Sequence, residues 1–202
     1  MKSKDMNIWK KFTKFFNDIE EKQYEKNIAE NNQEDVLVIN NKNSIKGKYK
    51  VYDNNGNLKY NVKGKTISHK PYLNIYNKFG KKIAIIQQEK RSSRLYYKHD
   101  LIFKIANRQS GVFNQKLNIL KRTYSLDNGW NINTNVFKGK YEIKNSNKII
   151  ATIFQCGKYE EKISFEINEN ELLILMVTLS ISMYNIIDEK YMKMVSKDGS
   201  GC

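Results

Sequence analysis

Short runs of alternating apolar and polar residues fill the middle of the chain, between residues 36 and 167, and no helical period interrupts them. The runs are rich in β-branched and aromatic residues, and groups of Asn, Asp, Gly and Ser separate them, as is typical of strands joined by tight turns. Three such groups, at 53–56, 77–80 and 145–147, contain the Asn or Gly that positive-φ turns require. We therefore predict an antiparallel β domain. Its expected strands are 36–39, 49–53, 58–62, 72–76, 83–88, 95–98, 101–106, 116–126, 141–144, 149–155 and 162–167.

A different pattern, an uncharged and mostly apolar run, covers residues 172–187. A helix of this length reaches about 24 Å, which is short of a hydrocarbon core of about 30 Å. Since the run is apolar on almost every face, such a helix must be buried in protein or in a membrane. The acidic residues on both flanks are unlike the basic anchors of a membrane span. We expect a helix enclosed by protein, with a membrane span as the alternative, and with Asn168 and Glu171 as the capping pair at its start.

Residues 6–28 have a helical period instead, because apolar residues recur there at three- and four-residue steps. This amphipathic stripe fits a helix docked on the main domain. It also fits an interfacial helix whose aromatic residues enter the headgroup layer while its lysines meet anionic lipid. The candidate membrane-contact residues are Trp9, Lys10, Lys11, Phe12, Phe15 and Phe16. We divide the chain into an N-terminal amphipathic helix with its linker (1–35), a β domain (36–195) and a flexible tail (196–202).

The compartment follows from the N-terminus and the cysteines. The N-terminus lacks the long apolar run and the small-residue cleavage site of a signal peptide. Cys156 and Cys202 are interpreted as free thiols, as is usual in the cytosol. We expect a cytoplasmic protein, and peripheral attachment to the inner face of the membrane is compatible with that location.

The sequence contains an internal repeat, since KGKYKV at 46–51 recurs as KGKYEI at 138–143. Four identities in a row among common residue types can arise by chance, but each copy is also followed by an Asn-rich turn and a second β-rich run. A duplicated hairpin explains both features. We therefore predict that the hairpins 49–62 and 141–154 occupy equivalent positions in a barrel with approximate twofold symmetry.

The order of these units, repeated hairpins followed by one charge-free helix, resembles that of the LURP-one-related family, which shares the tubby C-terminal-like fold with phospholipid scramblases. The resemblance covers residues 36–195 and is carried by 49–57, 73–83, 141–143 with 149–153, and the apolar helix. It implies a closed antiparallel barrel of about twelve strands around the hydrophobic C-terminal helix. Tubby-type proteins bind phosphoinositides through basic surface residues and scramblases act at membranes, although neither set of ligand residues transfers to positions here. The chain departs from the family in its N-terminal helix and in Ser146 and Asn147, which replace a turn glycine.

Positive charge is concentrated in the β domain. The formal net charge is +15, and residues 36–155 alone carry +19. Lys, Asn, Ile and Tyr share A/T-rich codons, so genome composition and selection for an anionic partner are both open explanations. The segment 90–98 has two arginines beside two tyrosines, which suits phosphate oxygens, although a solvated hairpin is the alternative. The candidate lipid- or anion-binding residues are Lys90, Arg91, Arg94, Lys98, Lys121 and Arg122.

No catalytic constellation emerges from the sequence. The neighbours His99 and Asp100, like Glu160 and Glu161, point to opposite faces in a strand, and the Lys-Gly-Lys triplets at 46–48 and 63–65 lack the spacing of a phosphate loop. We therefore expect no catalytic residues, no metal site and no cofactor. The preferred function is a non-enzymatic module that binds anionic phospholipid or a membrane surface through a basic barrel face. The alternatives are a nucleic-acid-binding module, with tyrosines stacking on bases, and a structural barrel that binds a protein.

Overall fold

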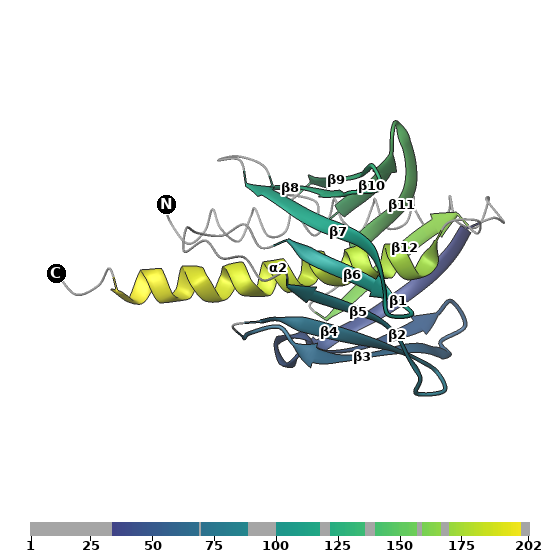
Figure 1. Ribbon diagram of the computed structural model, residues 1–202, viewed down its shortest axis with the longest axis horizontal. Coiled ribbons are helices and arrows are strands. Elements are labelled where there is room, and N and C mark those ends of the chain that lie inside the picture. Colours follow the sequence, from purple (N-terminus) through teal and green to yellow (C-terminus); the bar gives the residue numbers. More distant parts are fainter. Residues whose placement is uncertain are drawn as a thin grey trace, which may run out of the picture.

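The computed structural model of the chain describes residues 34–68, 70–88, 100–117, 122–135, 140–156, 159–166 and 170–198. Within these residues the chain forms twelve antiparallel strands that close into a barrel, and one long helix passes through it (Figure 1). The expected mainly β class, the closed barrel and the C-terminal helix are confirmed. The N-terminal helix expected over 6–28 lies outside the described residues.

Each strand pairs with its neighbours in the sequence, and β12 closes the ring by pairing with β1. The first half of the ring is formed by β1 (Glu34–Asn43), the 3-10 turn η1 (Ser44–Lys46), β2 (Lys48–Asp53), β3 (Leu58–Lys65), β4 (Tyr72–Asn77), β5 (Lys82–Gln88) and β6 (Leu101–Ile105). The second half is formed by β7 (Arg108–Leu117), β8 (Arg122–Leu126), β9 (Trp130–Asn135), β10 (Lys140–Asn145), β11 (Lys148–Gln155) and β12 (Glu160–Glu166). The helix α2 spans Glu171–Asp198.

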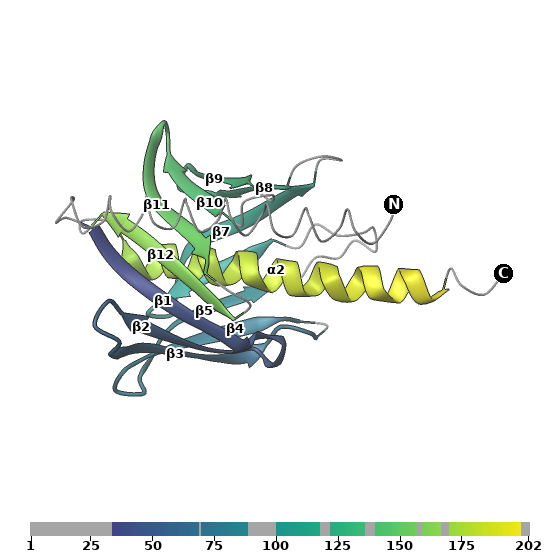
Figure 2. The same ribbon diagram turned by 180° about the vertical axis from the view of Figure 1, so that it is seen from behind.

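The core lies between the inner faces of the strands and α2. Figure 2 shows the strands around this helix from behind. Alternate strand residues point inward, so the side chains of Leu37 and Ile39 on β1 are buried. The helix is buried on all sides over residues 173–184. Stacked rings join it to the wall, with the centroid of Phe113 5.6 Å from that of Tyr124 and 6.0 Å from that of Tyr184. The expectation that the charge-free run is enclosed by protein is confirmed.

No described helix combines the length and the hydropathy that a membrane span requires. The start of α2 differs from the expected capping pair. Asn170 is the capping residue, because its Oδ1 accepts a hydrogen bond from the Leu173 amide at 3.1 Å. The cap predicted at Asn168 is therefore wrong, since the helix begins two residues too late for it. Glu171 accepts hydrogen bonds from Lys59 and from the Tyr60 hydroxyl instead, and so ties α2 to β3.

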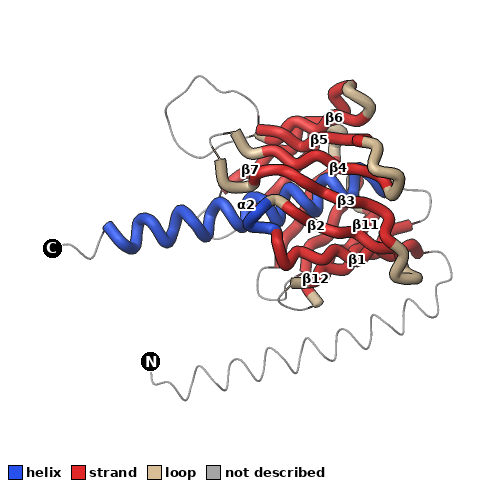
Figure 3. Tube along the Cα trace, turned by 90° about the horizontal axis from the view of Figure 1, so that it is seen from below, coloured by secondary structure: helices blue, strands red, loops and turns tan. Residues whose placement is uncertain are grey.

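The two ends of the barrel differ in their connections (Figure 3). At the hairpin end lie the turns of β2–β3, β4–β5, β6–β7, β8–β9 and β10–β11, and α2 enters there beside Tyr60. At the exit end lie η1 and the connection from β3 to β4, and η1 contacts α2 as the helix leaves the barrel. The helix continues past the strands to Asp198 (Figure 1), beyond residue 195, where the sequence-based division ended the β domain.

The predicted turns at 53–56 and 77–80 are confirmed and have the same construction. The Asp53 carboxylate accepts hydrogen bonds from the backbone amides of Asn55 and Asn57. The Asn77 side chain likewise accepts from the amides of residues 79 and 81. Gly56 and Gly80 have φ of 77° and 78°, which explains the glycine in each turn. In the turn without a glycine, Ser146 takes the positive φ, at 53°.

Some strand predictions need correction. The single strand expected over 116–126 is wrong, because β7 and β8 pair with each other there, with Gln115 opposite Tyr124. The segment has no glycine or proline to reveal the reversal. β9 was not predicted, since Trp130 and Ile132 are its only apolar residues. The strand expected at 95–98 lies outside the described residues.

The predicted twofold relation between the repeated hairpins is also wrong. Both segments are hairpins of one barrel, β2–β3 and β10–β11. In the closed ring that the described strands form, a twofold axis would relate β2–β3 to β8–β9 rather than to β10–β11. The shared KGKY sequence therefore marks two similar hairpins in inequivalent positions of the barrel.

Candidate functional site

Most residues predicted to bind ligands lie outside the described residues. This applies to Lys90, Arg91, Arg94, Lys98 and Lys121 and to the helix residues Trp9, Lys10, Lys11, Phe12, Phe15 and Phe16. It also applies to His69 and His99. Arg122 is the first residue of β8, and its backbone therefore lies at the exit end. The ends of β5 and β7 and the starts of β6 and β8 lie at that same end, because strands alternate in direction around the ring.

Two Lys-Gly-Lys triplets, 46–48 and 63–65, meet at the exit end of the barrel. A Cβ at Gly47 would lie 2.6 Å from the carbonyl carbon and oxygen of Gly64, and a Cβ at Gly64 would lie 2.0 Å from the Tyr72 carbonyl oxygen. Glycine at both positions permits this close backbone approach. The approach gathers four exposed lysines, here called the lysine cluster: Lys46, Lys48, Lys63 and Lys65.

The register of β2 and β3 places like charges side by side in the lysine cluster. Lys48 is directly opposite Lys63, an arrangement that destabilises a strand pair. The only acidic residue between positions 36 and 88 is Asp53, whose carboxylate is held in the turn at the hairpin end. No ion pair to the lysine cluster is found among the described residues. The cluster is therefore an uncompensated cationic surface.

Exposed apolar side chains accompany these lysines at the exit end. Ile45 in η1 is 64% exposed and Ile67 is 37% exposed. The buried Thr66 hydroxyl joins their segments by donating to the Ile45 carbonyl oxygen at 2.8 Å. The rim of the barrel thus combines aliphatic and cationic side chains.

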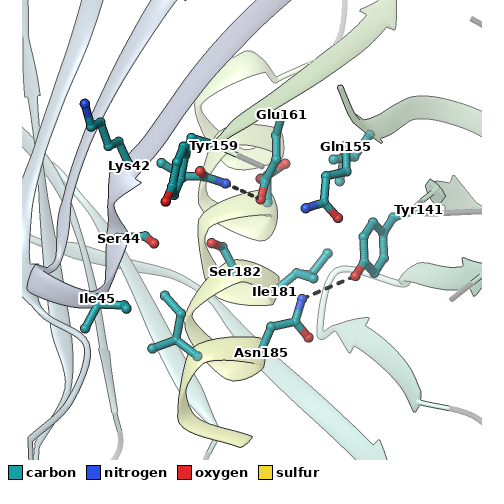
Figure 4. A pocket seen from close by; sticks show the side chains of 14 residues that line it. Lys42, Ser44, Ile45, Tyr141, Gln155, Tyr159, Glu161, Ile181, Ser182 and Asn185 are labelled. Carbon is teal, nitrogen blue, oxygen red and sulfur yellow. Dashed lines mark hydrogen bonds between the residues drawn. The ribbon is translucent and has the colours of Figure 1, made fainter. Parts of the chain in front are cut away.

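A cavity of about 340 Å³ opens between α2 and the barrel wall at the exit end (Figure 4). Its wall is formed by β1, η1 and the strands β10 to β12, and its floor by the last buried turns of α2. Its lining mixes polar residues, among them Glu161, Ser182 and Gln155, with apolar ones such as Ile181 and Ile186. The site is therefore amphipathic.

Glu161 is the carboxylate of this cavity. It faces inward, because it continues the alternation of Ile163 and Phe165, both buried on β12. Its Oε1 accepts a hydrogen bond from Asn41 Nδ2 at 3.1 Å. Burial raises the pKa of Glu161 to about 7, and the hydrogen bond from Asn41 lowers it only in part.

Tyr49 and Tyr141, from the two KGKY repeats, both reach toward α2. The Tyr49 hydroxyl is buried near Ser182 and Glu161 but makes no hydrogen bond of good geometry among the described residues. Burial raises the pKa of Tyr49. The Tyr141 hydroxyl accepts a hydrogen bond from Asn185 Nδ2 at 3.3 Å (Figure 4).

Sequence reasoning missed this cavity and the lysine cluster. It correctly separated Glu160 from Glu161, since Glu160 is exposed and Glu161 faces inward. The signal for Glu161 was its position two residues before Ile163, on the apolar face of the strand. The two Lys-Gly-Lys triplets were visible, but their contact depends on strand pairing.

Comparison with known proteins gives two matches. A family model described as LURP-one-related matches residues 35–183. Among solved structures, the chain is similar to an X-ray structure of a protein from Arabidopsis thaliana, with 16% sequence identity and a TM-score of 0.43, over 76% of this chain and 92% of that chain. The search of curated proteins found no match.

Proposed function

The chain belongs to the LURP-one-related family, and we propose that it is a non-enzymatic binding module that docks the exit end of its barrel on an anionic lipid surface. The observation that carries the proposal is the lysine cluster. Four exposed cations with no ion pair among the described residues create a positive potential that attracts an anionic surface within about a Debye length, roughly 10 Å. Each lysine near such a surface contributes about 1 kcal/mol.

The apolar rim supports a membrane in preference to a free anion. Ile45 and Ile67 are exposed beside lysines, a combination suited to the boundary between headgroups and acyl chains. A soluble anion would gain nothing from these aliphatic side chains. The exit end therefore offers both contributions that peripheral membrane binding uses.

Further residues extend this proposal. Six residues predicted to bind anions are bordered in the sequence by strand ends at the exit end: Lys90, Arg91, Arg94, Lys98 and Lys121 in connections between strands, and Arg122 at the start of β8. We propose that these residues add cationic charge to the docking surface, and that the N-terminal segment with Trp9 and Phe12 adds aromatic contacts. The corresponding location is the cytoplasmic face of the membrane.

A charge-matched pair of variants tests the docking surface. Lys48→Gln with Lys63→Gln removes two charges from the lysine cluster. Lys144→Gln with Lys148→Gln removes two charges from β10 and β11, where each lysine pairs with a glutamate. In flotation with vesicles containing phosphatidylserine, the first pair should weaken binding about thirtyfold, and the second by less than about threefold. Equal losses in the two double variants would contradict a localised docking surface.

A nucleic-acid function is the second candidate, because two tyrosines lie on the outer face of β4 beside the lysine cluster. Tyr72 is opposite Lys65, and Tyr76 lies near Lys63. Lys63 Nζ lies 5.8 Å from the centroid of the Tyr76 ring, and such aromatic rings can stack on bases. Ile45→Gln with Ile67→Gln separates the two functions, since it removes the apolar contacts and leaves the charge unchanged. Under the lipid proposal this variant weakens vesicle binding. Tight single-stranded nucleic-acid binding, together with unchanged vesicle binding by the variant, would favour the second function.

A further inference from the structure

The cavity at the exit end contains a carboxylate with no cation paired to it among the described residues. The Glu161 side chain accepts its hydrogen bond from a neutral amide, that of Asn41. Lys42 also lines the cavity, but Figure 4 shows its amine directed away from the Glu161 carboxylate. A partly buried carboxylate without a counter-ion is costly unless a cation or several donors reach it.

A second buried polar group lies beside the cavity. The Tyr49 side chain is only 3% exposed, and its hydroxyl lies near Ser182 and Glu161 but makes no hydrogen bond of good geometry among the described residues. Tyr49 does not itself line the cavity, and its hydroxyl adds to the polar surroundings of Glu161. Glu161, Ser182 and Tyr49 come from β12, α2 and β2, and only the closed barrel brings them together.

Isoleucine side chains supply the apolar part of a lining that is otherwise mostly polar. Ile153 of β11 and Ile181 and Ile186 of α2 line the cavity. A volume of about 340 Å³ is at the lower end of the range for small-molecule sites. The site therefore has a carboxylate, isoleucine side chains, and room for a small amphiphile.

We propose that this cavity binds a small organic amine, with its ammonium group against the Glu161 carboxylate and its alkyl part against Ile181 and Ile186. The proposal goes beyond the lipid-docking function, because the site lies inside the rim and uses none of the lysine cluster. The ammonium group donates to the carboxylate oxygens. The alkyl part displaces water from the isoleucine side chains.

Binding should depend on pH through Glu161. The pKa of this carboxyl is raised to about 7, so the ionised form that attracts an ammonium group becomes dominant as the pH rises above that value. The other titratable side chains around the carboxylate are Lys42 on β1, Tyr49 on β2, Tyr141 on β10 and Tyr159 before β12. Amine affinity should therefore increase from about one pH unit below 7 to about one unit above it.

Calorimetric titration with hexylamine, 1-hexanol and hexanoate tests the proposal on the full chain. The three probes have the same alkyl chain and differ in charge. Above the pKa of Glu161, hexylamine should bind at least about tenfold more tightly than hexanol, and hexanoate should bind most weakly. Equal affinity for hexylamine and hexanol, or no detectable hexylamine binding, would overturn the proposal.

Two isosteric variants locate the binding. Glu161→Gln should lose hexylamine affinity about tenfold and lose its pH dependence, while its hexanol affinity stays unchanged. Glu160→Gln is the matched control, because Glu160 is the exposed neighbour of Glu161 on the same strand and its variant should bind as the parent does. Thermal melting confirms that both variants are folded. An unchanged hexylamine affinity in Glu161→Gln would refute the site, whatever the outcome of the vesicle experiments.

Discussion

The hairpins β2–β3 and β10–β11 begin with the same KGKY sequence but differ in how far their lysines are paired with acids. In β2–β3 the residue after the tyrosine is Lys50, and the lysine cluster near it has no ion pair among the described residues, although Lys59 pairs with Glu171. In β10–β11 the same position holds Glu142, which contacts Lys140 at 3.1 Å and Lys144 at 3.2 Å. Glu142 therefore offsets part of the lysine charge in the second hairpin, whereas Lys50 adds to the charge of the first.

The environment of Glu142 shows how the second hairpin compensates its charge. Partial burial would raise the pKa of Glu142, but the hydrogen bonds and charges of Lys140 and Lys144 outweigh it and lower the pKa below its usual value. Lys148 also pairs with Glu166 on β12, at 2.7 Å. Such exposed pairs add little stability, so their main effect is on the surface potential. Net charge alone, as counted from the sequence, does not distinguish these two surfaces.

The largest expected effect comes from adding a side chain at Gly64, where β3 approaches β4 closely beside the lysine cluster. Gly64→Ala places a Cβ 2.0 Å from the Tyr72 carbonyl oxygen, so the strands must separate. We expect a loss of about 3 kcal/mol in the free energy of unfolding, measured by urea denaturation. Gly56→Ala is the control, because nothing lies within 4 Å of its Cβ and only its positive φ is strained. That control should lose about 1 kcal/mol. Equal losses would show that the close approach is not needed.

The next effect comes from exchanging the charges that distinguish the hairpins. Lys50→Glu combined with Glu142→Lys keeps the net charge and places an acid beside the lysine cluster. We expect binding to phosphatidylserine vesicles to weaken about tenfold, because the local potential and not the total charge attracts the surface. Vesicle flotation of the double variant beside the parent chain measures this loss of binding. Unchanged binding would mean that net charge alone drives association.

The smallest expected effect concerns the inward-facing tyrosines of the two hairpins, Tyr49 and Tyr141. Tyr141→Phe removes the hydrogen bond from Asn185 and should cost about 1 kcal/mol of stability. Tyr49→Phe removes a hydroxyl that makes no hydrogen bond of good geometry among the described residues and should be neutral or slightly stabilising. Thermal unfolding of both variants checks the difference. A larger loss in Tyr49→Phe than in Tyr141→Phe would reveal a partner for the Tyr49 hydroxyl.

Local features of the fold were predictable from the sequence. Alternation placed most strands correctly, and the turns around Gly56 and Gly80 followed from residue types that accept positive φ. The charge-free run 172–187 required burial on all sides, because a helix without a polar face has no side to present to water. Misplaced features were those with weak local signals, such as the reversal between β7 and β8 and the Asn-rich β9.

The candidate sites depend on strand pairings between residues that are far apart in the sequence. Asn41 and Glu161 are 120 residues apart and meet because β12 closes the ring on β1. Gly47 and Gly64 meet because of the register of β2 and β3, and a slip of one residue would turn the flanking lysines to the other face. Local sequence determines backbone preferences and which residues face inward, since these depend on near neighbours. Only the closed barrel decides which inward and outward residues of distant strands meet, because that depends on register and closure around the helix.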